Sequence, residues 1–136
     1  MMKSNLYYQK ESNMRLKMLE SKVQEDIISY LKKNRIYHFR FQAQSNLNGL
    51  PDIICLYKGF FIGLELKREK GGTPTGLQLR KIKAINDNGG IGLIVRSVYE
   101  VEMLLDVIKD YYTDNNICSE DILSYYEIRK SANEKK

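Results

Sequence analysis

Residues 51–67 contain the feature that most constrains the fold: two apolar runs on either side of Lys58-Gly59. Apolar runs of this length around a two-residue turn predict a β-hairpin. A turn centred on Lys58-Gly59 places Asp52 opposite Glu65, with Cβ atoms about 5 Å apart. Lys67 lies two residues further along the strand and therefore on the same face as Glu65. The sequence thus predicts two carboxylates and one ammonium group at the open end of a mostly apolar hairpin.

These three charged groups admit two interpretations. Two carboxylates at this separation repel each other, and a hard divalent cation such as Mg²⁺ or Mn²⁺ would offset the repulsion. The alternative is a salt-bridge cluster of Asp52, Glu65 and Lys67 at a strand end. A bulge at Lys58-Gly59 would shift the register and weaken the case for the pair. The residue types alone leave these alternatives open.

The rest of the chain predicts an α/β domain with a mixed sheet, because helical and strand-like periodicity alternate along it. The expected elements are a helix over 14–34, a strand over 36–41, a polar loop over 42–49, the hairpin, a helix from Pro74 to about Asn88, a strand over 91–95, a helix that Ser97 and Glu100 begin with a capping box, and an optional last helix over 119–129. We expect 1–13 to be a loose N-terminal arm, 14–112 the folded domain and 113–136 a C-terminal extension.

Composition excludes several classes of protein. At 136 residues, of which 43% are hydrophobic and 29% charged, the chain suits one globular domain that needs no disulfides. Cys55 and Cys118 form no CxxC unit, which indicates a reducing compartment; we expect Cys55 to be a core residue. The single histidine, His38, excludes sites built on several imidazoles and is expected to be structural. No apolar run is long enough to cross a bilayer or to act as an export signal, so we expect a cytoplasmic protein.

Charge is distributed unevenly along the chain. Residues 1–100 carry 17 Lys and Arg against 9 Asp and Glu, whereas residues 101–136 carry 5 against 8. A basic body with an acidic end is typical of a protein that binds a polyanion such as nucleic acid. Solubility charge with a mildly acidic last helix is the alternative.

The order of these motifs resembles a known nuclease signature. Gly49-Leu50-Pro51-Asp52 followed by Glu65-Leu66-Lys67 resembles the PD-(D/E)XK pattern. With Glu20-x-x-x-Gln24 before it and Gln78 after it, the pattern resembles the virus-type replication-repair nuclease (VRR-NUC) domain over about residues 19–97. The length best fits the small stand-alone form found in phages and mobile elements. The resemblance implies a restriction-endonuclease-like αβββαβ core, with a central mixed sheet flanked by helices.

The resemblance also implies a role for each matched residue. Asp52 and Glu65 would be ligands of Mg²⁺ or Mn²⁺, with the backbone carbonyl of Leu66 as a third. Lys67 would position or activate the attacking water. Glu20 would complete the metal site or hold a water of that site, and Gln78 would orient the lysine or the phosphate. From the residues alone, Glu20 could equally be a surface acid, Gln78 could close a capping box with Thr75, and Gln24 is expected at a core boundary.

The implied activity is that of a metal-dependent, structure-selective DNA endonuclease. We expect it to act on branched DNA such as four-way (Holliday) junctions, and to do so as a C2 homodimer, since one site cuts one strand. A bacterial host cell and a phage origin fit the stand-alone form. The basic residues available to hold the DNA backbone are Lys32, Lys33, Arg35, Arg40, Lys58, Arg68, Lys70, Arg80, Lys81 and Lys83.

Two other functions remain open: a sequence-specific restriction-type enzyme of the same fold, and a non-catalytic DNA-binding protein. The apolar last helix could form a dimer interface or pack on its own domain.

Overall fold

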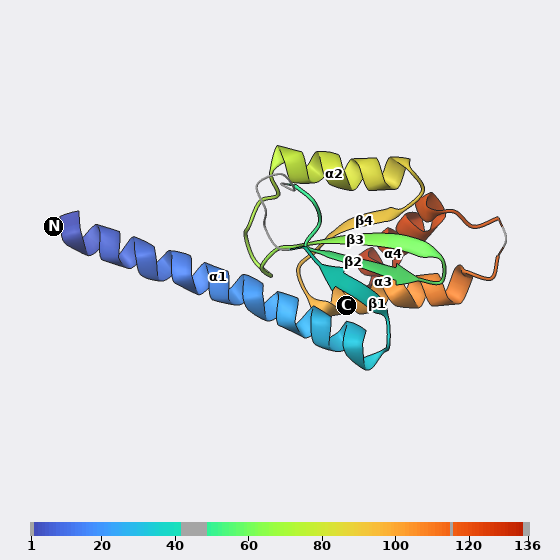
Figure 1. The fold of residues 1–136 in the computed structure, drawn as a ribbon, viewed down its shortest axis with the longest axis horizontal. Coiled ribbons are helices and arrows are strands. Elements are labelled where there is room, and N and C mark those ends of the chain that lie inside the picture. Colours follow the sequence, from blue (N-terminus) through green and yellow to red (C-terminus); the bar gives the residue numbers. More distant parts are fainter. Residues whose placement is uncertain (1, 42–48, 115, 135–136) are drawn as a thin grey trace.

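The computed structural model describes residues 2–41, 49–114 and 116–134, and most of the polar loop expected over 42–49 lies outside them. Figure 1 shows a sheet with helices on both sides and one long helix that projects from it. The elements are α1 (Met2–Lys33), β1 (Tyr37–Arg40), β2 (Ile53–Tyr57), β3 (Phe60–Leu66), α2 (Gly76–Asp87), β4 (Ile91–Val95), α3 (Val98–Tyr111) and α4 (Ser119–Glu134). The predicted α/β class is confirmed.

The sheet is mixed, as predicted. Its strand order is β1-β2-β3-β4, with antiparallel pairing except between β3 and β4, which are parallel. In the hairpin, Tyr57 pairs with Phe60 and Ile53 with Leu64, which is the register the sequence predicts. Lys58 and Gly59 both have positive φ, 52° and 86°, as the tight primed turns of two-residue hairpins require. The turn therefore contains no bulge, and the paired register ends at Ile53 and Leu64, the residues next to Asp52 and Glu65.

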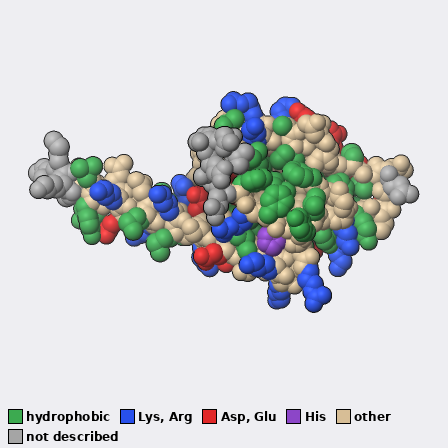
Figure 2. Space-filling view, in the orientation of Figure 1, with side chains coloured by type: hydrophobic (Ala, Val, Ile, Leu, Met, Phe, Trp, Pro, Cys, Tyr) green, Lys and Arg blue, Asp and Glu red, His purple; other side chains and the backbone are tan. Residues whose placement is uncertain are grey.

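The two faces of the sheet are covered differently. Alternate residues of β2 and β3, from Ile53 to Leu66, are buried on one face beneath α1 and α3. On the other face α2 covers β3 and β4 (Figure 1). Beside it, over β1 and β2, side chains such as Tyr37 and Leu56 stay exposed, and Figure 2 shows an apolar area there.

Two glycines let α2 lie close to the sheet. Gly63 and Gly92 are register partners on β3 and β4. A Cβ atom on Gly92 would lie 2.8 Å from the carbonyl oxygen of Ile82, and one on Gly63 would lie 2.7 Å from Ile85 Cδ1. Since both contacts are shorter than van der Waals distance, a larger residue at either position would push α2 away from the sheet.

The N-terminal segment differs from the prediction. The expectation of a loose arm over 1–13 was wrong for its described part, because α1 begins at Met2 and continues without a break to Lys33. Neither Gly nor Pro interrupts this stretch, so a helix can form there although no core-facing periodicity marks it. Only the second half packs on the body, through Val23, Ile27 and Leu31. The arm is therefore a projecting helix (Figure 1).

The C-terminal elements also differ in detail. α4 continues to Glu134 instead of ending at Arg129. Its Ile122 and Tyr126 are fully buried against the domain core, so these two residues pack on their own domain. At the start of α3, Ser97 makes no side-chain cap; Glu100 instead accepts a hydrogen bond from the Arg96 N–H at 3.0 Å. None of the helices in the described part of the chain has the length and apolar character needed to cross a bilayer.

Candidate active site

The open end of the hairpin holds Asp52 in place through the backbone. Asp52 directly precedes β2, and its carbonyl oxygen accepts a hydrogen bond from the Phe41 N–H at 3.1 Å. Its Oδ2 accepts a second hydrogen bond, at 2.8 Å, from the N–H of Leu66 on the neighbouring strand. The Asp52 carboxylate is thus tied across the hairpin to the segment that carries Glu65 and Lys67.

Glu65 is the most unusual residue of this site, because its side chain is only 2% exposed. Its Oε1 accepts a hydrogen bond from Gln78 Nε2 at 2.6 Å and lies 3.7 Å from Lys67 Nζ. Burial raises the pKa of Glu65 to about 8; the Asp52 carboxylate adds to the rise, and Lys67 opposes it. The salt-bridge alternative is thus present only in part, since Lys67 is paired with Glu65, whereas the Asp52 carboxylate is held by the Leu66 N–H.

A hard divalent cation fits these residues. Glu65 Oε2 is buried and has no hydrogen-bond partner among the described groups, which is costly for a carboxylate oxygen. A cation at this oxygen would satisfy it and offset the repulsion from Asp52. The available ligands are two carboxylates and the carbonyl of Leu66, and oxygen ligands are those that Mg²⁺ and Mn²⁺ prefer. Within the described ranges, no three His, Cys, Asp or Glu side chains are grouped closely enough to hold a metal ion together.

Gln78 performs both tasks that the sequence left as alternatives. It is residue N3 of α2, where its Oε1 accepts from the Thr75 N–H at 2.9 Å and its own N–H donates to Thr75 Oγ1 at 3.1 Å. This capping box fixes the side chain, and its remaining amide donor points at Glu65. The cap of α2 therefore positions a hydrogen-bond donor in the site.

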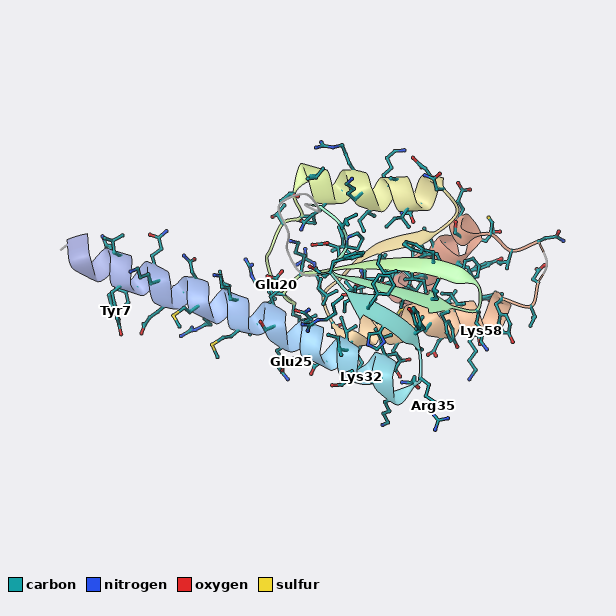
Figure 3. The ribbon with its side chains drawn as sticks, in the orientation of Figure 1. Tyr7, Glu20, Glu25, Lys32, Arg35 and Lys58 are labelled. Atoms are coloured by element: carbon teal, nitrogen blue, oxygen red, sulfur yellow. The ribbon has the colours of Figure 1, made fainter. Side chains whose placement is uncertain are left out.

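α1 closes the site from the side. A polar cavity of about 370 Å³ is lined by Lys17, Glu20, Ser21, Gln24, Asp52, Glu65, Leu66, Lys67 and Gln78. Figure 3 shows Glu20 on the side of α1 that faces the body, whereas Tyr7 and Glu25 point away. All the predicted catalytic and metal-binding residues thus surround one cavity.

Three of these lining residues were not among the predicted site residues. Gln24 was expected at a core boundary, and no sequence motif predicted a role for Lys17 or Ser21. Helical spacing could have found them, because residues three, four and seven positions apart share a face of α1 with one another. The motif itself includes only Glu20 as a catalytic residue of this helix, so it gives no signal for the neighbouring positions on the same face.

A loop beside the site is held by a single arginine. Arg96 donates hydrogen bonds to three backbone carbonyls, those of Arg68 at 3.0 Å, Gly72 at 2.9 Å and Gly71. These residues follow Lys67 directly in the chain. The segment between the end of β3 and the start of α2 is therefore fixed although it forms neither helix nor strand.

The predicted DNA-binding residues do not form one cluster. Arg68 and Lys70 lie on the loop next to Lys67, and Arg80, Lys81 and Lys83 lie on α2 after Gln78. Lys83 is paired with Asp87 at 2.5 Å. Figure 3 shows Lys32 and Arg35 near the C-terminal end of α1 and Lys58 at the hairpin turn, all of them apart from Glu20. Arg40 and Lys32 border a separate hollow with His38, whose Nδ1 lies 2.8 Å from the carbonyl oxygen of Ile36.

Neither cysteine lines the polar cavity. Cys55 is fully buried in the core, where burial raises the pKa of its thiol to about 12, and Cys118 is exposed; both are free. A second cavity, of about 410 Å³, is apolar and lies between α2 and the sheet, against Pro51, Phe61 and Ile85. Lys81 lies at this cavity, but none of the residues that line it is a carboxylate.

Comparison with known proteins identifies the fold. A solved structure described as a VRR_NUC domain matches with a TM-score of 0.54 and 22% sequence identity, over 68% of this chain and 97% of that chain. The fold that the motif order implied is thereby confirmed. No family model and no curated protein matches the chain.

Proposed function

We propose that this protein is a metal-dependent DNA endonuclease that hydrolyses phosphodiester bonds in branched DNA. The observation that carries the proposal is the buried Glu65 carboxylate next to Asp52, one oxygen of which has no hydrogen-bond partner in the described part of the chain. If these two carboxylates had no function, replacing them with apolar residues of similar size would be expected to stabilise the fold. Perturbed carboxylates that line a polar cavity are typical of catalytic sites.

The metal would be held by Asp52, Glu65 and the carbonyl of Leu66. When bound there, Mg²⁺ or Mn²⁺ supplies Lewis-acid activation of water and neutralises charge on phosphoryl oxygens. Glu20, across the cavity, would accept a hydrogen bond from a water molecule of the site.

The side chains of the cavity would orient the substrate. Lys67 Nζ, beside Glu65, would donate a hydrogen bond to a phosphate oxygen and stabilise the charge that develops on it during hydrolysis. Gln78 would keep the Glu65 carboxylate in one orientation through its 2.6 Å hydrogen bond. The loop fixed by Arg96 would present Arg68 and Lys70 to the neighbouring phosphates.

The preference for branched DNA rests on how the basic residues are distributed. They are available for phosphate contacts, which position DNA without reading its sequence, and no element resembles a base-reading module. Two sites are needed to cut two strands symmetrically, so the active species would be a C2 homodimer. Tyr125 and Ile128 on α4, which are 38% and 67% exposed, are candidates for such an interface.

The decisive experiment is an incubation of four-way junctions, flapped duplexes, linear duplexes and plasmid with Mg²⁺, Mn²⁺ or EDTA. We expect cleavage of branched substrates with either metal and none with EDTA. Discrete fragments from plain plasmid would instead indicate a restriction-type enzyme. Binding without cleavage of any substrate in either metal would contradict an enzymatic role.

A further inference from the structure

The projecting half of α1 carries a basic face that continues directly into the polar cavity. Lys10, Lys17 and Gln24 are seven residues apart, so they lie on nearly the same face of the helix, with a drift of only about 20° per step. Lys17 and Gln24 line the cavity. Lys10 is exposed two turns further out on the same face.

The carboxylates of this part of α1 flank the face on either side. Tyr7 and Met14 lie beside Lys10 at helical spacings of three and four, and they are 60% and 64% exposed. Ser21 and Gln24 continue the face towards Glu65 without adding a charge. Two carboxylates border it: Glu11 lies about 100° around the helix from Lys10, and Glu20, which lines the same cavity, lies about 60° from Lys17 on the other side.

We propose that this face, defined by Lys10, Met14, Lys17 and Gln24 and called here the arm face, binds the DNA backbone on one side of the cleavage site. The inference rests on the function proposed above and adds a substrate-binding surface to it. A phosphodiester backbone is the partner whose charge complements two lysines two turns apart on one face of a helix.

A second copy of the chain fits this face less well. If two arm faces packed against each other, Lys10 and Lys17 of one copy would meet lysines of the other, and like charges repel. A polyanion meets no such repulsion. The arm face is also continuous with the cavity, where the scissile phosphate would lie. One DNA strand could therefore contact both the arm face and the cavity.

The dimensions of the helix set the length of DNA that would be contacted. Lys10 and Gln24 are separated by fourteen residues, or about 21 Å along the axis at 1.5 Å per residue. One strand of a duplex carries a phosphate about every 3.4 Å along its axis, so the arm face spans roughly six phosphates. Substrates trimmed within about six base pairs of the cleavage site should therefore lose affinity.

The test compares two double variants of the full-length protein that remove the same charge from the same helix. Lys10→Gln with Lys17→Gln alters the arm face. Arg15→Gln with Lys22→Gln alters a face five residues, or about 140°, away. Glutamine keeps the helix propensity close to that of lysine and arginine, and circular dichroism checks that both variants retain the helix.

Affinity is measured by fluorescence anisotropy on a labelled four-way junction and on a duplex, in EDTA, across a series of salt concentrations. For the duplex, a plot of log affinity against log salt has a slope of about −0.9 per phosphate contact. We expect the arm-face variant to reduce that slope by about 1.8 and the control variant to leave it near the wild-type value. If both variants gave equal slopes while the wild-type protein cleaved DNA, the arm-face proposal would be overturned and the proposed function would stand.

Two further outcomes are distinguishable. Sedimentation of the same variants reports whether the arm face joins copies of the chain; a change of oligomeric state with unchanged DNA affinity would overturn the proposal. A wild-type protein that neither binds nor cuts any DNA would contradict the proposed function itself, and with it the arm face.

Discussion

Gln78 Nε2 lies 2.6 Å from Glu65 Oε1, so the first turn of α2 is hydrogen-bonded to the buried carboxylate of the sheet. The same side chain closes the capping box with Thr75. The geometry of the candidate site and the N-terminus of a helix therefore depend on one residue, and substitutions can separate the two.

Gln78→Ala should reduce both stability and cleavage, whereas Thr75→Ala should reduce stability alone. Each removes a capping interaction, which costs about 1 kcal/mol in the free energy of unfolding. Only Gln78→Ala also releases Glu65. Urea denaturation and cleavage assays on both variants measure the two effects. If Thr75→Ala impaired cleavage as much as Gln78→Ala, the hydrogen bond to Glu65 would have no separate role.

Asp52→Asn, Glu65→Gln and Lys67→Met should each abolish cleavage but leave DNA binding in EDTA close to wild type. The asparagine keeps an acceptor for the Leu66 N–H, whereas Asp52→Ala would leave that N–H without a partner at a cost of about 1–3 kcal/mol. Turnover assays in Mg²⁺ and in Mn²⁺ check the expectation. Wild-type turnover by any of the three variants would refute the role assigned to that residue.

The stability of the metal-free protein should fall as pH rises from about 5 towards 8. Glu65 has a folded-state pKa of about 8, above the ordinary value of 4.5 that it would have when unfolded. Between these values the folded state binds more protons than the unfolded state, so the free energy of unfolding decreases with pH. Glu65→Gln should flatten this dependence and be more stable than wild type at pH 8. Thermal melts in EDTA across this pH range, with Glu69→Gln as an exposed control, measure it.

Mg²⁺ or Mn²⁺ should raise the melting temperature of the wild-type protein. A cation that binds only the folded state stabilises it in proportion to the logarithm of its concentration above Kd. Because the metal competes with the proton on Glu65, the increase should be larger at pH 8 than at pH 6. Neither Asp52→Asn nor Glu65→Gln should show the same increase. An equal rise in all three proteins would place the cation elsewhere.

Gly92→Ala should destabilise the fold by about 1–3 kcal/mol, the usual cost of an overpacked contact. The added methyl group would meet the Ile82 carbonyl oxygen, a backbone atom that can move only with α2. Because α2 carries Gln78, cleavage should fall even at temperatures where the variant remains folded. Gly89→Ala tests overpacking separately, since nothing lies within 4 Å of its added Cβ; it is expected to cost only backbone strain, at a φ of 88°.

The hairpin was predictable because its register depends on local chemistry. A two-residue turn at Lys58-Gly59 and an apolar alternation leave one pairing, which is the one observed. The αβββαβ order followed from similar local signals at caps and breaks. The burial of Glu65 could not be predicted in this way, since it depends on α2 lying close above Gly63 and Gly92, and that contact joins residues distant in sequence.

The first half of α1 shows the opposite limit. Prediction from periodicity detects the face that a helix buries, and this segment buries none against the described body. Its exposed Leu6 and Tyr7 therefore show no periodicity that predicts a helix. Lys17 was not predicted for the same reason: it lies where the packed and the projecting halves of the helix meet, and its side chain is exposed.

The arginine that holds the loop after Lys67 also has a consequence for the entropy of ligand binding. Three carbonyls of residues 68–72 are already satisfied by Arg96, so this segment loses its conformational freedom when the chain folds. A ligand that contacts Arg68 or Lys70 would therefore meet a preorganised surface and bear little ordering cost from this loop. Lysine at position 96 could not replace this function, because an ammonium group lacks the planar fork that reaches three acceptors at once. The entropic cost of ordering this loop is thus met when the chain folds, and the benefit is a higher affinity when a ligand binds.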